Sequence, residues 1–241
     1  MRRLFIWTLF LFSCSVYGQD NAATKVRKFF ISANFSPDYC YRTLIKNDKS
    51  ITDSAWTNAK SILDTIEVAK FGYTSGLVIG YQLKDFIGIE TGIQYSNKGY
   101  KTVPIMTIYD WNKPGALATN IFSHSYLDFP LRVNFTFFKK KVQVIASVGV
   151  VLNYIVQSSI KTIPQTPTTD FNTQKNINHY DFKKINLSPT VSVGLKYKLN
   201  DRVSLRAEPT FRYGLFNMDD KDFAGRHLWN LGLNVGVYVG L

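Results

Sequence analysis

The feature that most constrains this chain is a two-residue alternation between bulky apolar and small or polar side chains. In residues 202–216, RVSLRAEPTFRYGLF, the bulky set includes Val203, Leu205, Phe211 and Tyr213, and the polar set includes Arg206, Glu208 and Arg212. A period of two places the two sets on opposite faces of a β-strand. Seven further segments alternate in a similar way: residues 28–36, 70–83, 86–96, 126–138, 142–157, 185–199 and 228–241. The pattern predicts an all-β fold of eight strands.

The connections between these segments alternate in length. Three are short, at residues 84–85, 139–141 and 200–202, and four are long, at about residues 37–69, 97–123, 161–183 and 217–226. In an up-and-down antiparallel barrel this places every short turn at the end that holds both termini and every long loop at the other end. Barrels of bacterial outer membranes have an even number of strands and this distribution of loops.

The volumes of the two faces decide which one looks inward. The polar faces carry a set of charged residues: Glu90, Arg132, Lys196, Arg206, Glu208 and Arg212. The apolar faces carry large residues, such as Phe211, Tyr213, Trp229, Leu231 and Leu233. Since an eight-stranded barrel has room inside only for side chains or one small ligand, the bulky set would overfill it. We therefore expect an interior polar network and a lipid-facing apolar wall. The alternative is a soluble barrel that binds a small ligand, in which the apolar set would face inward.

The first residues have the layout of a secretory signal peptide. Arg2 and Arg3 precede an apolar run from Leu4 to Phe12, and small residues follow. We expect cleavage near Gln19, which leaves residues 20–241 as the barrel domain. Cleavage before Cys14 to give a lipoprotein is the alternative. No later stretch reaches 18 consecutive apolar residues, so no membrane-spanning helix is expected. Export without such a helix leaves a soluble periplasmic protein, a secreted protein or an outer-membrane barrel, and the alternating strands favour the bacterial outer membrane.

Charge and reactive residues argue against several other classes. The formal net charge is +12, or +10 without Arg2 and Arg3, but no nucleic-acid-binding motif accompanies it. The three histidines, His124, His179 and His227, show no spacing typical of a metal site. We expect no metal, no cofactor and no nucleic-acid partner, and we expect an inert Cys40.

One group of residues resembles an enzyme centre. His124, Ser125 and Asp128 lie near the outer end of a strand, and His227 could approach them from the last strand. Adjacent residues of a strand face opposite sides, so His124 and Ser125 are poorly placed to form a hydrogen bond. We therefore expect no catalytic residues. A lipid-modifying enzyme at the rim remains the alternative.

Two local features depart from the two-residue alternation of eight strands. Residues 53–67 have apolar residues at helical spacing, which predicts a short helix in the first long loop. Pro130, Pro189 and Pro209 fall inside expected strands, where proline removes a ladder hydrogen bond. We expect β-bulges at these three positions.

Several segments together resemble the outer membrane protein β-barrel domain family, also called PorT-like. They are KFGYTSGLVIGYQL, IGIETGIQYSNKGYKT, AEPTFRYGLF and WNLGLNVGVYVGL. The resemblance implies an eight-stranded outer-membrane barrel whose last strand is recognised by the barrel-assembly machinery. Gly236, Val239 and Leu241 match the ending of that strand, although the family often ends in Phe. One member of the family is associated with a protein-secretion apparatus.

The functional expectation is a structural or binding role through long extracellular loops. The partners would be outer-membrane lipid and a protein or glycan at the loops. The alternatives are the rim enzyme and a component of a protein secretion or transport assembly.

Overall fold

The computed structural model describes residues 28–47, 50–107, 116–138, 140–165, 173–176, 183–218 and 223–241. The expected signal peptide, residues 1–19, and Cys14 lie outside these residues, as do Trp111 and His179. The elements in chain order are β1 (Phe29–Lys46), α1 (Asp53–Ile66), β2 (Glu67–Lys84), β3 (Ile87–Thr102), β4 (Ile105–Thr107), β5 (Ala116–Phe137), β6 (Val142–Pro164), β7 (Thr173–Asn176), β8 (Ile185–Lys198), β9 (Val203–Tyr213) and β10 (Ala224–Gly240).

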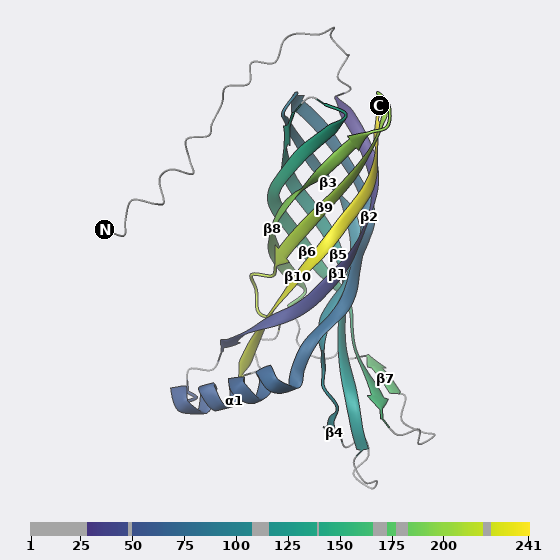
Figure 1. Cartoon of the computed structure of the whole chain (residues 1–241). Coiled ribbons are helices and arrows are strands. Elements are labelled where there is room, and N and C mark those ends of the chain that lie inside the picture. Colours follow the sequence, from purple (N-terminus) through teal and green to yellow (C-terminus); the bar gives the residue numbers. More distant parts are fainter. Residues whose placement is uncertain are drawn as a thin grey trace, which may run out of the picture.

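Eight of the strands close into a barrel (Figure 1). Around the ring the order is β1, β2, β3, β5, β6, β8, β9 and β10, and every neighbouring pair is antiparallel. The pairing of β1 with β10, which joins Phe30 to Gly240 at one end and Lys46 to Ala224 at the other, closes the ring. The expected eight-stranded up-and-down barrel is confirmed. We call its two ends the turn end, where the short connections and the C-terminus lie, and the loop end.

The long loops are shorter than expected because several strands continue into them. β1 runs to Lys46, β3 runs to Thr102, and β6 runs to Pro164. The alternation weakens in these extensions, since a wall outside a membrane needs no continuous apolar face. The backbone ladder nevertheless continues, because hydrogen bonding between strands does not depend on which side chains they carry.

The loop end carries structure beyond the barrel. β4 pairs with the outer part of β5 and β7 pairs with that of β6, so four strands form a projecting sheet. The expected helix is present as α1, and in Figure 1 it lies across the barrel axis, to one side of the loop end. Thr52 caps it, accepting a hydrogen bond from the amide of Ala55 at 3.3 Å. Among the described residues, no helix is both long and apolar enough to cross a bilayer.

The prolines do not produce the expected β-bulges. The register is continuous through Pro130, Pro189 and Pro209, and the shifts occur elsewhere, at 69–73, 82–84 and 125–126. The ladder is instead interrupted on one side of each proline. Pairing of β3 with β5 stops at Thr91–Leu131 and resumes at Gln94–Asp128, which skips Pro130. The missing N–H therefore falls where no hydrogen bond is formed.

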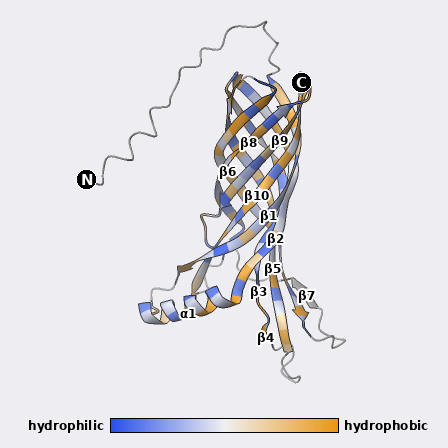
Figure 2. Ribbon diagram, in the orientation of Figure 1, coloured by the Kyte–Doolittle hydropathy of each residue, from blue (hydrophilic) through white to orange (hydrophobic). Residues whose placement is uncertain are grey.

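The alternation predicted from the sequence governs the wall of the barrel (Figure 2). Along β9 every second side chain is buried, from Ser204 to Arg212, and the intervening ones face outward. Outward residues are apolar and widely exposed, with Phe71 at 83% and Leu77 at 68% of their maximum. A sheet with this surface is stable only when the outer face lies in hydrocarbon. The apolar face is outside.

Candidate functional site: the filled lumen and the loop end

A buried charge cluster, which we call the turn-end quartet, consists of Glu90, Arg132, Arg206 and Glu208. Arg132 forms ion pairs with Glu90 and, at 3.5 Å, with Glu208. Arg206 lies 3.2 Å from Glu90 and 3.3 Å from Glu208. The barrel ladder aligns Glu90 with Arg132, which explains why residues 42 positions apart in sequence meet here. Two positive and two negative charges balance, so the cluster is neutral as a unit.

Neutral groups complete the turn-end quartet. Asn134 donates a hydrogen bond to Glu90 at 2.8 Å, and Ser192 donates to Glu208 at 3.1 Å. The guanidinium of Arg206 lies over the ring of Tyr238, 3.9 Å from its centroid. Lys196, expected in the same network, pairs with Arg206 in the ladder but is only half-buried. It forms no ion pair with any described residue.

Two further ion pairs lie nearer the middle of the barrel. Arg212 lies 3.6 Å from Asp38, and Lys98 lies 3.4 Å from Asp128. Asp38 also accepts hydrogen bonds from the hydroxyls of Ser36 and Thr74, both at 2.6 Å. Sequence reasoning missed Asp38 and Lys98 because both fall in stretches read as loops. Continuing the even-numbered polar face of residues 32, 34 and 36 by one step would have identified Asp38 as an interior residue.

An apolar cluster at the loop end covers these charges. Tyr100, Tyr126, Met218 and Leu228 are buried together. A water-filled pore would wet the carboxylates below it, yet Glu90, Asp38, Asp128 and Glu208 are at most 1% exposed. Side chains fill the described part of the lumen, as the width of an eight-stranded barrel dictates.

The residues considered for catalysis do not converge. His124 Nδ1 lies 2.5 Å from the hydroxyl of Ser158, not from Ser125. Asp128 accepts a hydrogen bond from Asn153 inside the barrel, and His227 Nδ1 lies 3.0 Å from a backbone carbonyl of the β9–β10 connection. Among the described residues no group of three His, Cys, Asp or Glu side chains is placed to hold a metal ion. Cys40 is a free thiol, fully buried in the wall.

Aromatic residues gather on the outer wall near the loop end. Trp229 lies about 6 Å, centroid to centroid, from three rings: Tyr39, Tyr41 and Phe211. Phe211, Leu231 and Leu233 are exposed on the outside, and Tyr213 and Trp229 are half-buried there. Such rings form the interfacial girdle of membrane barrels.

Trp229 should therefore report contact with lipid. The variant Trp56→Phe, Trp111→Phe leaves it as the one tryptophan after residue 19. In bilayers with brominated acyl chains, we expect its fluorescence to be quenched, most strongly by bromines near the headgroup. Unquenched fluorescence in a protein that stays soluble without detergent would contradict the lipid-facing wall.

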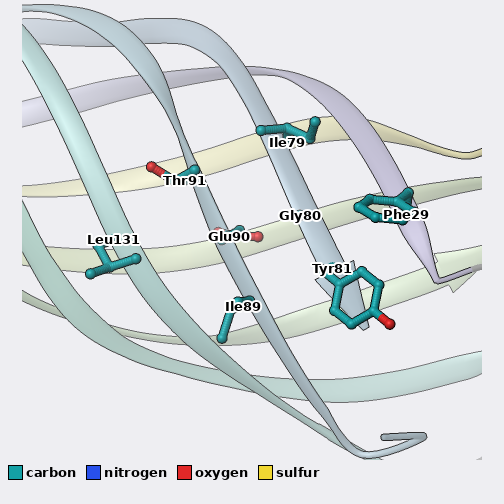
Figure 3. Close-up of a pocket in the computed structure, with 8 residues that line it drawn as sticks. All are labelled: Phe29, Ile79, Gly80, Tyr81, Ile89, Glu90, Thr91 and Leu131. Carbon is teal, nitrogen blue, oxygen red and sulfur yellow. The ribbon is translucent and has the colours of Figure 1, made fainter. Parts of the chain in front are cut away.

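A shallow apolar groove marks the outer wall near the turn end (Figure 3). Its volume is about 210 Å³, and its lining includes Phe29, Ile79, Tyr81, Ile89 and Leu131. Gly80, which has no side chain, forms part of its floor, while the carboxylate of Glu90 is buried on the inner side of the wall. The groove is lined mainly by apolar side chains and can accept hydrocarbon, and Thr91 and Tyr81 add hydroxyl groups to its lining.

Helix α1 is tied to β1 by its polar side. Arg42 donates hydrogen bonds to Asp64 at 2.5 Å and to the carbonyl of Leu63 at 2.9 Å, and Lys46 bonds Asp53 at 2.7 Å. No side chain of the helix is fully buried, and Ile62 is 61% exposed. Polar contacts, not apolar packing, therefore set the position of the helix.

This attachment should weaken in acid. Partial burial raises the pKa of Asp64, but hydrogen bonds from Lys60 and Arg42 outweigh it and bring the pKa below the ordinary 3.8. A lowered pKa means that the stabilisation is complete above pH 3.8 and is lost as the pH falls through the lowered value. In Trp111→Phe, Trp229→Phe protein, Trp56 emission should shift as the pH falls from 6 to 2. Asp64→Asn should show the shifted emission already at pH 6.

Asp53→Asn is the matched control for this measurement. The side chain of Asp53 is 96% exposed, so its ion pair with Lys46 should hold the helix only weakly. An equal effect of both substitutions would show that the attachment does not depend on the Arg42–Asp64 contact.

A closed antiparallel barrel with an apolar wall, an aromatic girdle and a charge-balanced interior defines a transmembrane β-barrel of the outer-membrane class. The family profile of the outer membrane protein β-barrel domain matches residues 21–220, and the chain belongs to that family. Its location is the bacterial outer membrane, as expected from the sequence.

Several solved outer-membrane proteins are similar to this chain. Neisserial surface protein A is 12% identical with a TM-score of 0.47, over 88% of this chain and 97% of its own. OprG from Pseudomonas aeruginosa is 11% identical with a TM-score of 0.47, over 88% and 95%. The outer membrane protease OmpT from Escherichia coli is 9% identical with a TM-score of 0.45, over 92% and 99%. A search of curated protein sequences returned no match.

Proposed function

We propose that this protein binds a protein partner at the cell surface through its loop end, with the filled barrel as its membrane anchor. In membrane barrels the short turns are periplasmic and the long loops lie outside. That orientation places α1 and the projecting sheet outside the cell. The ion-paired lumen argues against transport as the main role.

The observation that carries the proposal is the projecting sheet of β4, β5, β6 and β7. Pairing of β5 with β6 continues to Ala118–Pro164, well beyond the aromatic girdle. β4 and β7 each pair on one side, so each presents an open edge within the described residues. An open edge can accept an extended segment of another protein through backbone hydrogen bonds.

The outer face of this sheet also favours a protein over a glycan. Met106 is 66% exposed, and Leu117, its partner in the ladder, is 47% exposed. Ile163, on β6, adds a third exposed apolar residue at 39%. Apolar side chains complement the apolar side chains of a peptide, whereas a glycan offers mainly hydroxyl groups. The same reasoning favours binding over rim catalysis, since no described nucleophile faces this surface together with a base.

Site-specific photo-cross-linking on intact cells tests the proposal. A photoreactive amino acid at Met106 should give a discrete adduct with one partner, and the same group at Phe86 should not. Phe86 is 52% exposed at the turn end, so it controls for accessibility and expression. Absence of an adduct at Met106, or identical adducts at both positions, would contradict the proposal.

The identity of the adduct also tests a narrower assignment. We propose that the chain lies in the PorT-like group, because the four segments that begin at residues 70, 87, 207 and 229 resemble that group. A partner from a secretion or transport assembly of the envelope would support that placement. A partner from outside the cell would instead support a surface receptor or adhesion role.

A further inference from the structure

A polar area lies on the outer wall at the loop end, beyond the apolar band of the barrel. It lies on β3, β5 and β6 and consists of Asn97, Lys101, Ser123 and Lys161, which are half-buried or exposed. We call these residues the outer-wall patch. In the ladder Asn97 pairs with Ser125, and Lys101 pairs with Ile121, which in turn pairs with Lys161. The patch is therefore continuous across neighbouring strands.

The patch begins directly above the apolar wall. Tyr95 pairs with Leu127 and Leu127 with Tyr154, which makes one outward row of large residues. Both tyrosines are exposed, at 38% and 42%. Asn97, which is half-buried, lies in the next outward row, and Lys101 follows two rows later. At about 3.3 Å per residue on a strand tilted by about 40°, Lys101 lies roughly 15 Å beyond Tyr95. A lysine side chain can reach back over part of this distance.

The backbone is irregular at this level, and polar side chains bond to one another within the wall. Register shifts occur at 69–73 between β2 and β3 and at 125–126 between β5 and β6. The ammonium of Lys70, a residue only 7% exposed, donates to Asn97 and Ser123, both at 2.7 Å. Asn97 in turn donates to Ser125 at 3.2 Å. Both of these hydrogen-bond partners of Lys70 are neutral groups.

On the barrel strands the acidic side chains are buried, whereas the lysines of the outer-wall patch are exposed. Each acidic residue on the eight barrel strands is buried and at most 4% exposed: Asp38, Glu67, Glu90, Asp128 and Glu208. Lys101 and Lys161 are exposed, and neither forms an ion pair with a described residue. The wall thus offers positive charge and hydroxyl groups at the height of the headgroups, with no described carboxylate beside them. Lysines at this height attract anionic lipid headgroups.

We infer that the outer-wall patch binds the phosphorylated headgroup of an outer-leaflet glycolipid. Lys101 and Lys161 stand on either side of Ile121, two strand spacings or about 10 Å apart, a separation that a diphosphorylated headgroup can bridge. The amide of Asn97 and the hydroxyl of Ser123, both half-buried, supply neutral partners. The acyl chains of the same lipid would lie against Tyr95 and Tyr154. This site borders the projecting sheet, because Lys161 lies in the stretch of β6 that pairs with β7, but it does not include the open edges of β4 and β7.

Binding of purified diphosphorylated lipid A to the detergent-solubilised full chain tests the inference. The charge-reversal variant Lys101→Glu, Lys161→Glu should bind about tenfold more weakly than the unchanged protein. Lys84→Glu, Lys198→Glu is the matched control, because it reverses two exposed lysines at the turn end and should leave binding unchanged. Each protein is first shown to migrate as a folded barrel in SDS without heating.

Two further binding measurements identify the chemical group of the lipid that the patch recognises. Dephosphorylated lipid A should bind the unchanged protein weakly and should not discriminate between the variants. Inorganic phosphate at millimolar concentration should not displace the lipid. Equal affinity for the two lipids, equal losses in both variants, or displacement by free phosphate would each overturn the inference. None of these outcomes depends on a protein partner at the projecting sheet.

Discussion

Glu90→Gln is expected to destabilise the barrel by about 3–5 kcal/mol, the cost of removing one partner from a buried ion-pair network. Glu90 is 1% exposed and contacts both Arg132 and Arg206. Without it, two buried guanidinium groups share one carboxylate, Glu208. The urea midpoint of unfolding in lipid vesicles should fall accordingly, with an unchanged slope if the denatured state is unaffected.

A double variant separates charge balance from the loss of one contact. Glu90→Gln, Arg132→Met removes one charge of each sign and leaves Arg206 paired with Glu208 at 3.3 Å. Replacing a whole buried pair is often close to neutral, so most of the lost stability should return. Should Glu90→Gln alone leave the midpoint unchanged, the lumen must be open to water at this level, and the filled-barrel description would be wrong.

Gly92→Ala is expected to have a comparable effect, about 3 kcal/mol, through steric conflict with backbone. A Cβ atom at this position would lie 2.2 Å from the carbonyl oxygen of Leu77 and 2.8 Å from Cα of Val78. These atoms belong to the neighbouring strand β2 and can move only if the ladder widens. The cost lies at the upper end of the range for overpacking. Reduced yield of folded barrel and a lower unfolding midpoint are the measurable results.

Gly88→Ala is the control on the same strand. There the nearest atom to a new Cβ is the side-chain oxygen of Gln82, at 3.2 Å, which can rotate away. We expect a change of less than about 1 kcal/mol, as for a glycine replaced without conflict. If both variants behave alike, the effect at residue 92 reflects general strand propensity, and the close approach of β2 to β3 is not its cause.

Side-chain alternation was enough to predict the barrel, because a period of two fixes which residues share a face. Glu90, Arg132, Arg206 and Glu208 were assigned to the interior on this basis, and the structure buries all four. Trp229 and Leu231 were assigned to the outside, where the structure places them. Such reasoning works where the membrane imposes a strict apolar wall.

Side-chain alternation did not predict the structure of the strands beyond the part of the barrel that lies in the membrane. Asp38 and Lys98 were read as loop residues, although both lie in strands and form interior ion pairs. β4 and β7 are too short to show a pattern, and their edges arise only when β5 and β6 project beyond the barrel. Why the strands tolerate proline at these positions also depended on the ladder, because only the pairing of strands shows which backbone N–H groups form no hydrogen bond.

The amino-acid sequence by itself determined the class of protein, the number of barrel strands and the side of the wall that faces lipid. These follow from local periodicity and from the volume of the two faces, which every segment carries in its own residues. The tertiary structure alone decided which charges pair and where lysines gather on the outer wall. Ion pairs join residues from strands that are distant in sequence, and the register between strands, set by closure of the whole barrel, determines which of them meet.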